Sequence, residues 1–240
     1  MRQTDEVAGP ERWLWLRDGN LKRETESLII SAQEQAIRTN VIKAKIDKTQ
    51  TDSKCRMCGK VDESINHLLS ECSRLVQKEY KRRHDWVGKR VHWDVSKVCG
   101  FKVKDKWYEH EPEAVMVNDD CRILWDFTIE TDHAIQARIP DMIVEDRRNS
   151  HCKIIDFAVP YDNRVDNKEA EKIDKYQDLA REIKRLWNTQ VKIISAVVGW
   201  HHAKAATEEN ERNRTRDTYC ELERSVILCS ARILRKVLEI

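Results

Sequence analysis

Glycine and proline are scarce in this sequence, which contains six glycines and four prolines in 240 residues. Loops that cradle nucleotide phosphates need glycine-rich turns, and the sequence has no motif of that kind. Apolar runs are short as well: none approaches the ~18 residues of a membrane span, and residues 1–11 are polar and acidic, unlike a signal peptide. We therefore expect an intracellular protein that carries out neither ATP nor NAD chemistry.

An excess of charge of one sign is also nearly absent, because 44 Lys and Arg residues against 42 Asp and Glu residues leave a formal net charge of +2. A surface for nucleic acid would therefore have to come from local clusters. The contents of hydrophobic residues, 40%, and charged residues, 36%, indicate a folded protein with well-solvated helices. Of the eight cysteines, three have metal-ligand spacing and five are scattered singly, which favours a reducing compartment over a disulfide framework.

Helical periodicity dominates the N-terminal third. Apolar residues recur at helical spacing from Leu21 to about Lys48, which predicts one long amphipathic helix, and Ser70 to Val91 is also mainly helical in pattern, with a basic face. Short β-branched runs then predict strands at residues 123–129, 142–145, 153–159 and 191–200, and helical patterns cover about 167–188 and 222–238. These patterns predict an α/β protein with a small mixed sheet.

Four potential zinc ligands follow the pattern C-x2-C-x8-H-x4-C, formed by Cys55, Cys58, His67 and Cys72. Four sulfur and nitrogen donors can enclose Zn²⁺ tetrahedrally and leave no position open for a substrate, so we expect a structural site. Gly59 follows the first pair, where the backbone has to turn sharply. Three cysteines and a helical histidine could share this spacing by chance, but the paired spacing favours zinc.

Basic residues crowd around Tyr80 and Trp86 just after this zinc knuckle. They are Lys78, Lys81, Arg82, Arg83, His84, Lys89 and Arg90. Such a cluster could contact phosphates and stack on bases. A solvated helix face explains the same run equally well, so the cluster alone leaves contact with nucleic acid open.

Two carboxylates lie on neighbouring expected strands. Asp141 follows Pro140 at the start of one strand, and Asp156 lies within the next. Hard divalent cations prefer carboxylate oxygens, so the pair could hold Mg²⁺ or Mn²⁺, which polarises a phosphate and generates hydroxide. Glu145, on the same strand face as Asp141, is a third candidate ligand. Alternatively, an arginine such as Arg138 could satisfy the buried Asp156 without any metal.

Together these features resemble the PD-(D/E)xK nucleases, and more closely the restriction-like endonuclease at the C-terminal end of site-specific non-LTR retrotransposon polyproteins. Beyond the knuckle and the Pro-Asp pair, the similar stretches are WLRDGNLKRETESLIISAQEQAIRTN, EYKRRHDWVGKRVHW, GFKVKDKWYEHEPE, ILWDFTIETD, EAEKIDKYQDLAREIKRLW and ARILRKVLEI. The resemblance implies a restriction-endonuclease-like core and a parent protein that nicks chromosomal DNA to prime reverse transcription. The YxDD box of a polymerase is missing from this sequence.

The sequence departs from the superfamily pattern at Ala158, where a lysine is expected two residues after the second acid. In the retrotransposon branch, the resemblance implies that this lysine has moved to the following helix, which contains Lys172 and Lys175. The apolar stripe of this helix consists of Ile173, Tyr176, Ala180, Ile183 and Trp187. Helical geometry places Lys172 roughly 60° and Lys175 roughly 120° from the centre of this stripe. Lys172 is therefore the better candidate for the catalytic cation, although either lysine could simply be solvated.

We therefore expect a Mg²⁺- or Mn²⁺-dependent DNA endonuclease whose zinc is structural. Its expected partners are target DNA, the element's RNA and the parent reverse transcriptase, and its expected location is the nucleus or otherwise the cytoplasm. The alternative is a catalytically dead or domesticated fragment that only binds nucleic acid. The expected parts are a helical segment at 1–54, the CCHC knuckle at 55–72, a basic helical linker at 73–120, the nuclease core at 121–200, and a charged segment with a helix at 201–240.

Overall fold

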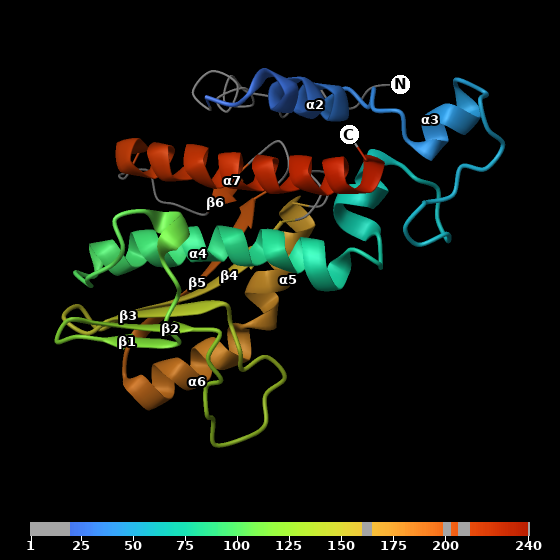
Figure 1. Cartoon of the computed structure of the whole chain (residues 1–240). Helices are drawn as coiled ribbons and strands as arrows, with labels where there is room; N and C mark the ends of the chain where they lie inside the picture. The colour runs from blue at the N-terminus through green and yellow to red at the C-terminus, as the bar shows by residue number, and fades with distance from the viewer. Residues whose placement is uncertain (1–19, 160–164, 199–202, 206–211, 240) are drawn as a thin grey trace. The chain divides into compact units, whose positions relative to one another are not determined.

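The structure is a computed structural model that describes residues 20–159, 165–198, 203–205 and 212–239 (Figure 1). The described residues fall into two compact units. The first unit contains residues 20–83, 203 and 212–239, and the second contains 84–159, 165–198 and 204–205. None of the helices in these ranges is long and apolar enough to cross a membrane.

A six-stranded sheet has its strands side by side in chain order. The strands are β1 (Val115–Val117), β2 (Cys121–Trp125), β3 (Met142–Asp146), β4 (His151–Ala158), β5 (Gln190–Val198) and β6 (Ala203–Ala205). Neighbouring strands from β1 to β4 are antiparallel, whereas β4 and β5 are parallel. The predicted mixed α/β fold is confirmed.

Helices cover both faces of this sheet in the second unit (Figure 1). On one face lie α5 (Val165–Lys175) and α6 (Gln177–Trp187), where Ile154 of β4 packs with Leu179 and Ile183 of α6. On the other face lies α4 (Lys81–Val98), which belongs to the second unit from His84 onward. Gly88 allows a close approach there, because a Cβ at this position would lie 2.5 Å from the Trp125 ring.

The first unit is helical. It contains α2 (Arg23–Gln33), α3 (Asn40–Lys45), two π-helical turns, η2 (His67–Glu71) and η3 (Val76–Tyr80), and α7 (Arg212–Leu238). Its core joins apolar residues of α2, η2 and α7, including Ile29, Leu68 and Leu234, with the buried cysteines Cys55 and Cys72. The zinc-motif cysteines are therefore part of the hydrophobic core of this unit.

The single helix predicted from Leu21 to Lys48 is wrong, because α2 ends at Gln33 and α3 starts at Asn40. Between them Gln35 has a left-handed backbone, with φ of 55°, and Ile37 is buried in the core. The helix predicted over 167–188 is divided at Tyr176, whose φ of −104° and ψ of 9° are not helical. Tertiary contacts override local periodicity in both places.

The strands follow the prediction more closely. The strand expected over 123–129 ends earlier, at Trp125, because Asp126 has a φ of 47°. The helix expected over 222–238 is present and begins earlier, at Arg212. The short strands β1 and β6 were not predicted, since three residues give too little pattern to recognise.

Candidate functional site

The four residues of the zinc knuckle lie together in the first unit, with ligand atoms all within 4.8 Å of one another. The sulfurs of Cys55 and Cys72 are 3.9 Å apart, and Cys58 Sγ is 3.3 Å from His67 Nε2. Two sulfurs bound tetrahedrally to one zinc ion at about 2.3 Å would be about 3.8 Å apart. The donor set and its spacing therefore fit Zn²⁺.

Local backbone geometry brings the ligands together. Cys55 donates its N–H to the Val61 carbonyl at 2.8 Å and accepts the Gly59 N–H at 2.7 Å, and Gly59 has a φ of 66°. This tight turn presents the first two cysteines. His67 and Cys72 stand at the two ends of η2, where the Cys72 N–H donates to the His67 carbonyl at 2.9 Å.

The thiols of the knuckle differ in acidity. The backbone N–H of Lys60 is the largest cause that lowers the pKa of Cys58, to about 6, whereas burial raises the pKa of Cys72 to about 11. Burial therefore favours the protonated thiol of Cys72 when no metal is bound. Bound zinc has the opposite effect, because it stabilises the deprotonated thiol.

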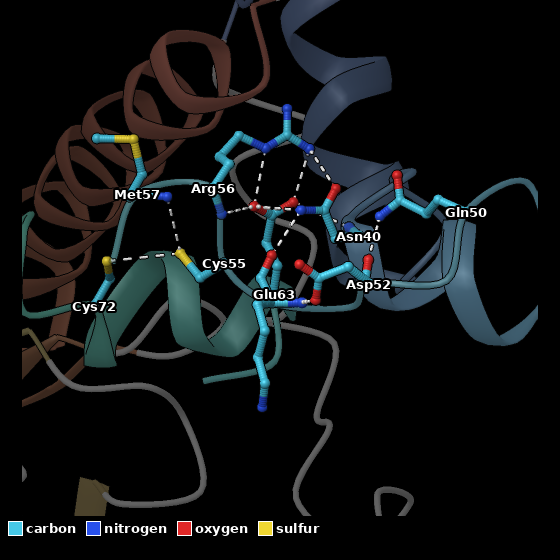
Figure 2. A network of polar contacts seen from close by, with 9 residues as sticks. Asn40, Gln50, Asp52, Cys55, Arg56, Met57, Glu63 and Cys72 are labelled. Atoms are coloured by element: carbon cyan, nitrogen blue, oxygen red, sulfur yellow. Dashed lines mark hydrogen bonds and ion pairs between the residues drawn. The ribbon is translucent and has the colours of Figure 1, made fainter. Parts of the chain in front are cut away.

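A buried carboxylate supports the loop that carries the first pair of cysteines (Figure 2). Glu63 accepts hydrogen bonds from Arg56 Nε at 2.9 Å, from the Arg56 N–H at 2.8 Å and from the Asn40 N–H at 3.0 Å. Burial alone would raise the pKa of Glu63, but Arg56 and these backbone groups hold it below its usual range. Glu63 therefore acts as an ionised anchor between α3 and the knuckle.

Two members of the predicted basic and aromatic cluster support the knuckle instead of facing solvent. The Tyr80 hydroxyl accepts the Cys72 N–H at 3.1 Å and donates to the Leu68 carbonyl at 2.9 Å. Arg83 is buried and donates to the Leu69 carbonyl at 2.8 Å and to Ser230 Oγ at 3.0 Å. Burial lowers the pKa of Arg83 to about 10.

The other basic residues of the cluster fall into two groups. Lys78, Lys81 and Arg82 are exposed in the first unit. Lys89 and Arg90 lie in the second unit and pair with Glu111 at 2.6 Å and Asp94 at 2.9 Å. His84 is partly buried beside Asp141.

A second polar cluster lies in the second unit around Asp156 of β4, of whose side chain 2% is exposed. The Tyr176 hydroxyl donates to Asp156 Oδ1 at 2.6 Å, and the Lys172 ammonium pairs with Oδ2. Lys175 lies further away, with Nζ 3.9 Å from Oδ1, and donates to the Tyr176 hydroxyl at 2.8 Å. Lys172 is thus closer than Lys175 to the acid, and the predicted alternative partner, Arg138, is replaced by these groups.

Asp141 is the next carboxylate of this cluster. It directly precedes β3, where Met142 pairs with Ile155, so continuing the register sets Asp141 beside Asp156. Its Oδ2 accepts the Phe157 N–H at 2.6 Å and lies 3.2 Å from His84 Nε2. We call Asp141, Asp156 and Lys172 the acidic centre.

Electrostatics favour an ionised Asp141. Burial alone would raise its pKa, but the hydrogen bond and charge of His84, the Phe157 N–H and the charge of Lys172 lower it. Burial alone would lower the pKa of His84, but the hydrogen bonds and charges of Asp141 and Asp85 raise it above its ordinary value. Asp141 therefore offers an ionised carboxylate, the ligand type that hard cations prefer, whereas the Asp156 carboxylate is paired with the Lys172 ammonium.

The structure does not bring Glu145 into this donor set. Its carboxylate pairs with Arg122 at 2.9 Å and Arg147 at 3.5 Å. Among the described residues, only the knuckle provides three or more His, Cys, Asp or Glu donors within reach of one ion. Mg²⁺ usually keeps several waters and takes one or two protein carboxylates together with substrate phosphates, so two aspartates fit it.

Sequence patterns missed three residues that lie at or beside the acidic centre. His84 was assigned to the basic helix face, and its partner Asp141 is 57 positions away in the chain. Tyr176 was assigned to an apolar stripe, although its hydroxyl holds Asp156. Ser195 of β5 is the register partner of Asp156, is buried, and its hydroxyl has no hydrogen-bond partner among the described residues. Only the strand pairing could have revealed Ser195.

Neither a family model nor a curated protein matches this sequence. Weak structural similarity exists to cap-snatching endonucleases of Phenuiviridae, with 16% identity over 45% of this chain and 50% of that chain at a TM-score of 0.36. A Toscana virus cap-snatching endonuclease gives 18% identity over 48% of this chain and 58% of that one, also at 0.36. An N-terminal domain of a reptarenavirus L protein gives 13% identity over 85% and 82%, at 0.32.

The chain therefore spans between half and three fifths of the length of the two cap-snatching endonucleases. The TM-scores of 0.36 and 0.32 are too low to transfer an activity or a substrate from these viral proteins. The chemistry of this chain has to be argued from its own residues.

Proposed function

We propose that this chain is a divalent-metal-dependent DNA endonuclease that derives from the C-terminal part of a non-LTR retrotransposon polyprotein. The observation that carries the activity is the acidic centre, where the continued strand register sets Asp141 opposite Asp156 and the Lys172 ammonium pairs with Asp156. The lineage is supported by the combination of sequence stretches quoted above, with the knuckle upstream of the two acids.

Each residue of the acidic centre has a role in this proposal. Asp141 and Asp156 would hold Mg²⁺ or Mn²⁺, which polarises a phosphate and supplies hydroxide at neutral pH. His84 and the Phe157 N–H orient the Asp141 carboxylate, and Tyr176 orients that of Asp156. The Lys172 ammonium stands where it can stabilise negative charge on a phosphate at these carboxylates.

The remaining features concern binding. The knuckle would hold structural zinc, and the exposed Lys78, Lys81 and Arg82 close to it in sequence would contact DNA phosphates. In the parent protein, nicking of a nuclear DNA target would free a 3′-hydroxyl for a reverse transcriptase that copies the element's RNA. Target DNA, that RNA and the polymerase are therefore the proposed partners.

Nicking of supercoiled plasmid by zinc-loaded protein tests the activity. Asp141→Asn and Asp156→Asn should each abolish the Mg²⁺- or Mn²⁺-dependent conversion to open circles, because each removes a negative ligand while keeping the side-chain shape. Asp178→Asn is the matched control, since this aspartate is exposed on α6 and pairs with the exposed Arg181. Wild-type rates in both site variants would exclude the acidic centre as the active site.

The second candidate function is nucleic-acid binding without cleavage. The observation in its favour is that Lys172 and Tyr176 already satisfy Asp156, so this acid is stable without a metal. The same assay separates the two functions. A chain that binds DNA but never nicks it with Mg²⁺ or Mn²⁺, even joined to a polymerase part, would support binding alone.

A further inference from the structure

Four aromatic side chains gather on α4 and on η4 (Trp107–Glu109), a 3-10 turn of the second unit. We call Trp86, Trp93, Trp107 and Tyr108 the aromatic surface. The ring centroids of Trp86 and Trp107 are 5.0 Å apart with the planes at 71°, and those of Trp107 and Tyr108 are 6.1 Å apart at 79°. Trp93 joins them through Arg90, whose guanidinium lies 5.4 Å from Trp93 and 5.6 Å from Trp107.

These rings are held in place yet remain accessible. The Trp93 indole N–H donates to the Lys104 carbonyl at 2.7 Å, which fixes that ring. The three tryptophans are partly exposed and Tyr108 is 47% exposed, whereas Phe157 and Tyr176 in the sheet core are each 1% exposed. Four large aromatic side chains that keep contact with water on one helix and its adjacent turn indicate a binding surface.

Cations lie beside each ring of the aromatic surface. Lys89 is 5.9 Å from the Trp86 ring centroid, Lys97 is 4.2 Å from that of Trp93, and Lys106 is 5.7 Å from that of Tyr108. Residues 86–108 contain six Lys or Arg residues and two Asp residues, so this stretch has a formal charge of +4 while the whole chain has +2. This stretch is therefore locally basic, and two of its cations also pair with acids that follow it, Lys106 with Glu109 at 3.6 Å and Lys89 with Glu111 at 2.6 Å.

From this juxtaposition we infer that the aromatic surface binds single-stranded nucleic acid. Unpaired bases expose their faces and can stack on indole and phenol rings, while the neighbouring cations take the phosphates. A duplex buries its base faces within its own stack, so it has no free base face to stack on these partly exposed rings. The inference goes beyond cleavage, because none of these residues belongs to the acidic centre.

Binding of labelled oligonucleotides to zinc-loaded protein without Mg²⁺ tests the inference, because the acidic centre does not cut under these conditions. A single strand should bind more tightly than a duplex of the same length. Parallel measurements with DNA and RNA oligonucleotides show which of the two the surface prefers. Tyr108→Ala should weaken single-strand binding about fivefold or more, since one stacked base contributes ~1–3 kcal/mol. Phe127→Ala is the matched control, because this ring is 40% exposed outside the aromatic surface.

The phosphate contacts have their own readout. Replacing Lys97 and Lys106 by Ala together should reduce the slope of log affinity against log salt by about 1.4, at roughly 0.7 for each single-strand phosphate contact. Lys184→Ala on the exposed side of α6 should leave the slope unchanged.

Three results would overturn the inference. The first is equal affinity of the wild-type protein for duplex and single strand. The second is an unchanged single-strand affinity in Tyr108→Ala together with an unchanged salt slope in the lysine double variant. The third is a wild-type protein that binds neither form. Each is independent of whether the protein nicks plasmid with Mg²⁺, so failure of this inference and failure of the nuclease are separate outcomes.

Discussion

Two lysines near the end of α5 differ in how they meet Asp156. Lys172 pairs directly with Oδ2 and has 22% of its side chain exposed, whereas Lys175 Nζ lies 3.9 Å from Oδ1 with 46% exposed. Lys172→Ala should therefore slow the first plasmid nick about 10²-fold or more, the usual loss for one preorganised electrostatic contact. Lys175→Ala should lose less. Initial nicking rates at saturating Mg²⁺ measure this, and equal losses would show that the two ammonium groups are equivalent.

A buried histidine pair outside the acidic centre sets a pH dependence of stability. His92 Nδ1 lies 2.7 Å from His110 Nε2, with Ser96 Oγ 3.3 Å away and the Trp125 ring edge-on. Burial, and to a smaller extent the charge of His110, lower the pKa of His92 from its ordinary 6.5 to about 4. The folded state therefore resists protonation that the unfolded chain accepts.

Stability contributed by neutral His92 is complete above pH 6.5 and is lost as the pH falls from 6.5 to 4. The loss amounts to about 3 kcal/mol of unfolding free energy at ~1.4 kcal/mol per pKa unit. In urea unfolding, the free energy of unfolding of the wild type should fall between pH 7.5 and pH 5, and this fall should be smaller in His92→Gln. His133→Gln, at an exposed histidine, should keep the full fall. An identical fall in all three proteins would rule out His92 as its source.

Single residues also show where sequence patterns reach their limit. The helical positions of the two lysines favoured Lys172 over Lys175, and Lys172 is also the one that lies closer to Asp156. Arg83 and His84 are adjacent in a basic run, yet one is buried against Ser230 and the other contacts Asp141. Their partners come from distant strands and helices, which composition cannot reveal.

At the scale of elements, continuous periodic patterns were recognised better than their interruptions. The sheet strands β2 to β5 stand close to where β-branched runs predicted them. The breaks were not predictable: α2 and α3 are separated where Asn40 bonds Glu63, and α5 and α6 where Tyr176 bonds Asp156. At both breaks a residue donates a hydrogen bond to a buried carboxylate that is 20 or more positions away in the chain.

The knuckle is an element whose stability should depend on its metal. Purified protein should contain about one Zn²⁺, and Cys55→Ser with Cys58→Ser should lose it and lower the melting temperature, because two ligands belong to the first unit's core. Cys121→Ser, at a cysteine outside the motif, should retain full zinc. Metal analysis with thermal unfolding measures both. Stoichiometric zinc in the double variant would contradict the ligand assignment.

At the scale of the molecule, the two polar centres belong to different units. The knuckle lies in the first unit and the acidic centre in the second. The boundary between the two units falls within α4, after Arg83. Zinc content and divalent-metal binding at the acidic centre should therefore respond to separate substitutions. The sequence could indicate both centres through local spacing, but the unit boundary within α4 follows from packing and has no signal in the helical pattern.

The central claim is that Asp141 and Asp156 hold one divalent cation between them. The most direct test measures Mn²⁺ binding to zinc-loaded protein by electron paramagnetic resonance. We predict that wild type binds Mn²⁺ in addition to zinc, and that Asp156→Asn binds it at least about tenfold more weakly, since one negative ligand is lost. Asp178→Asn should bind like wild type. Equal Mn²⁺ affinity in wild type and Asp156→Asn would contradict a metal site at the acidic centre and the nuclease proposed on it.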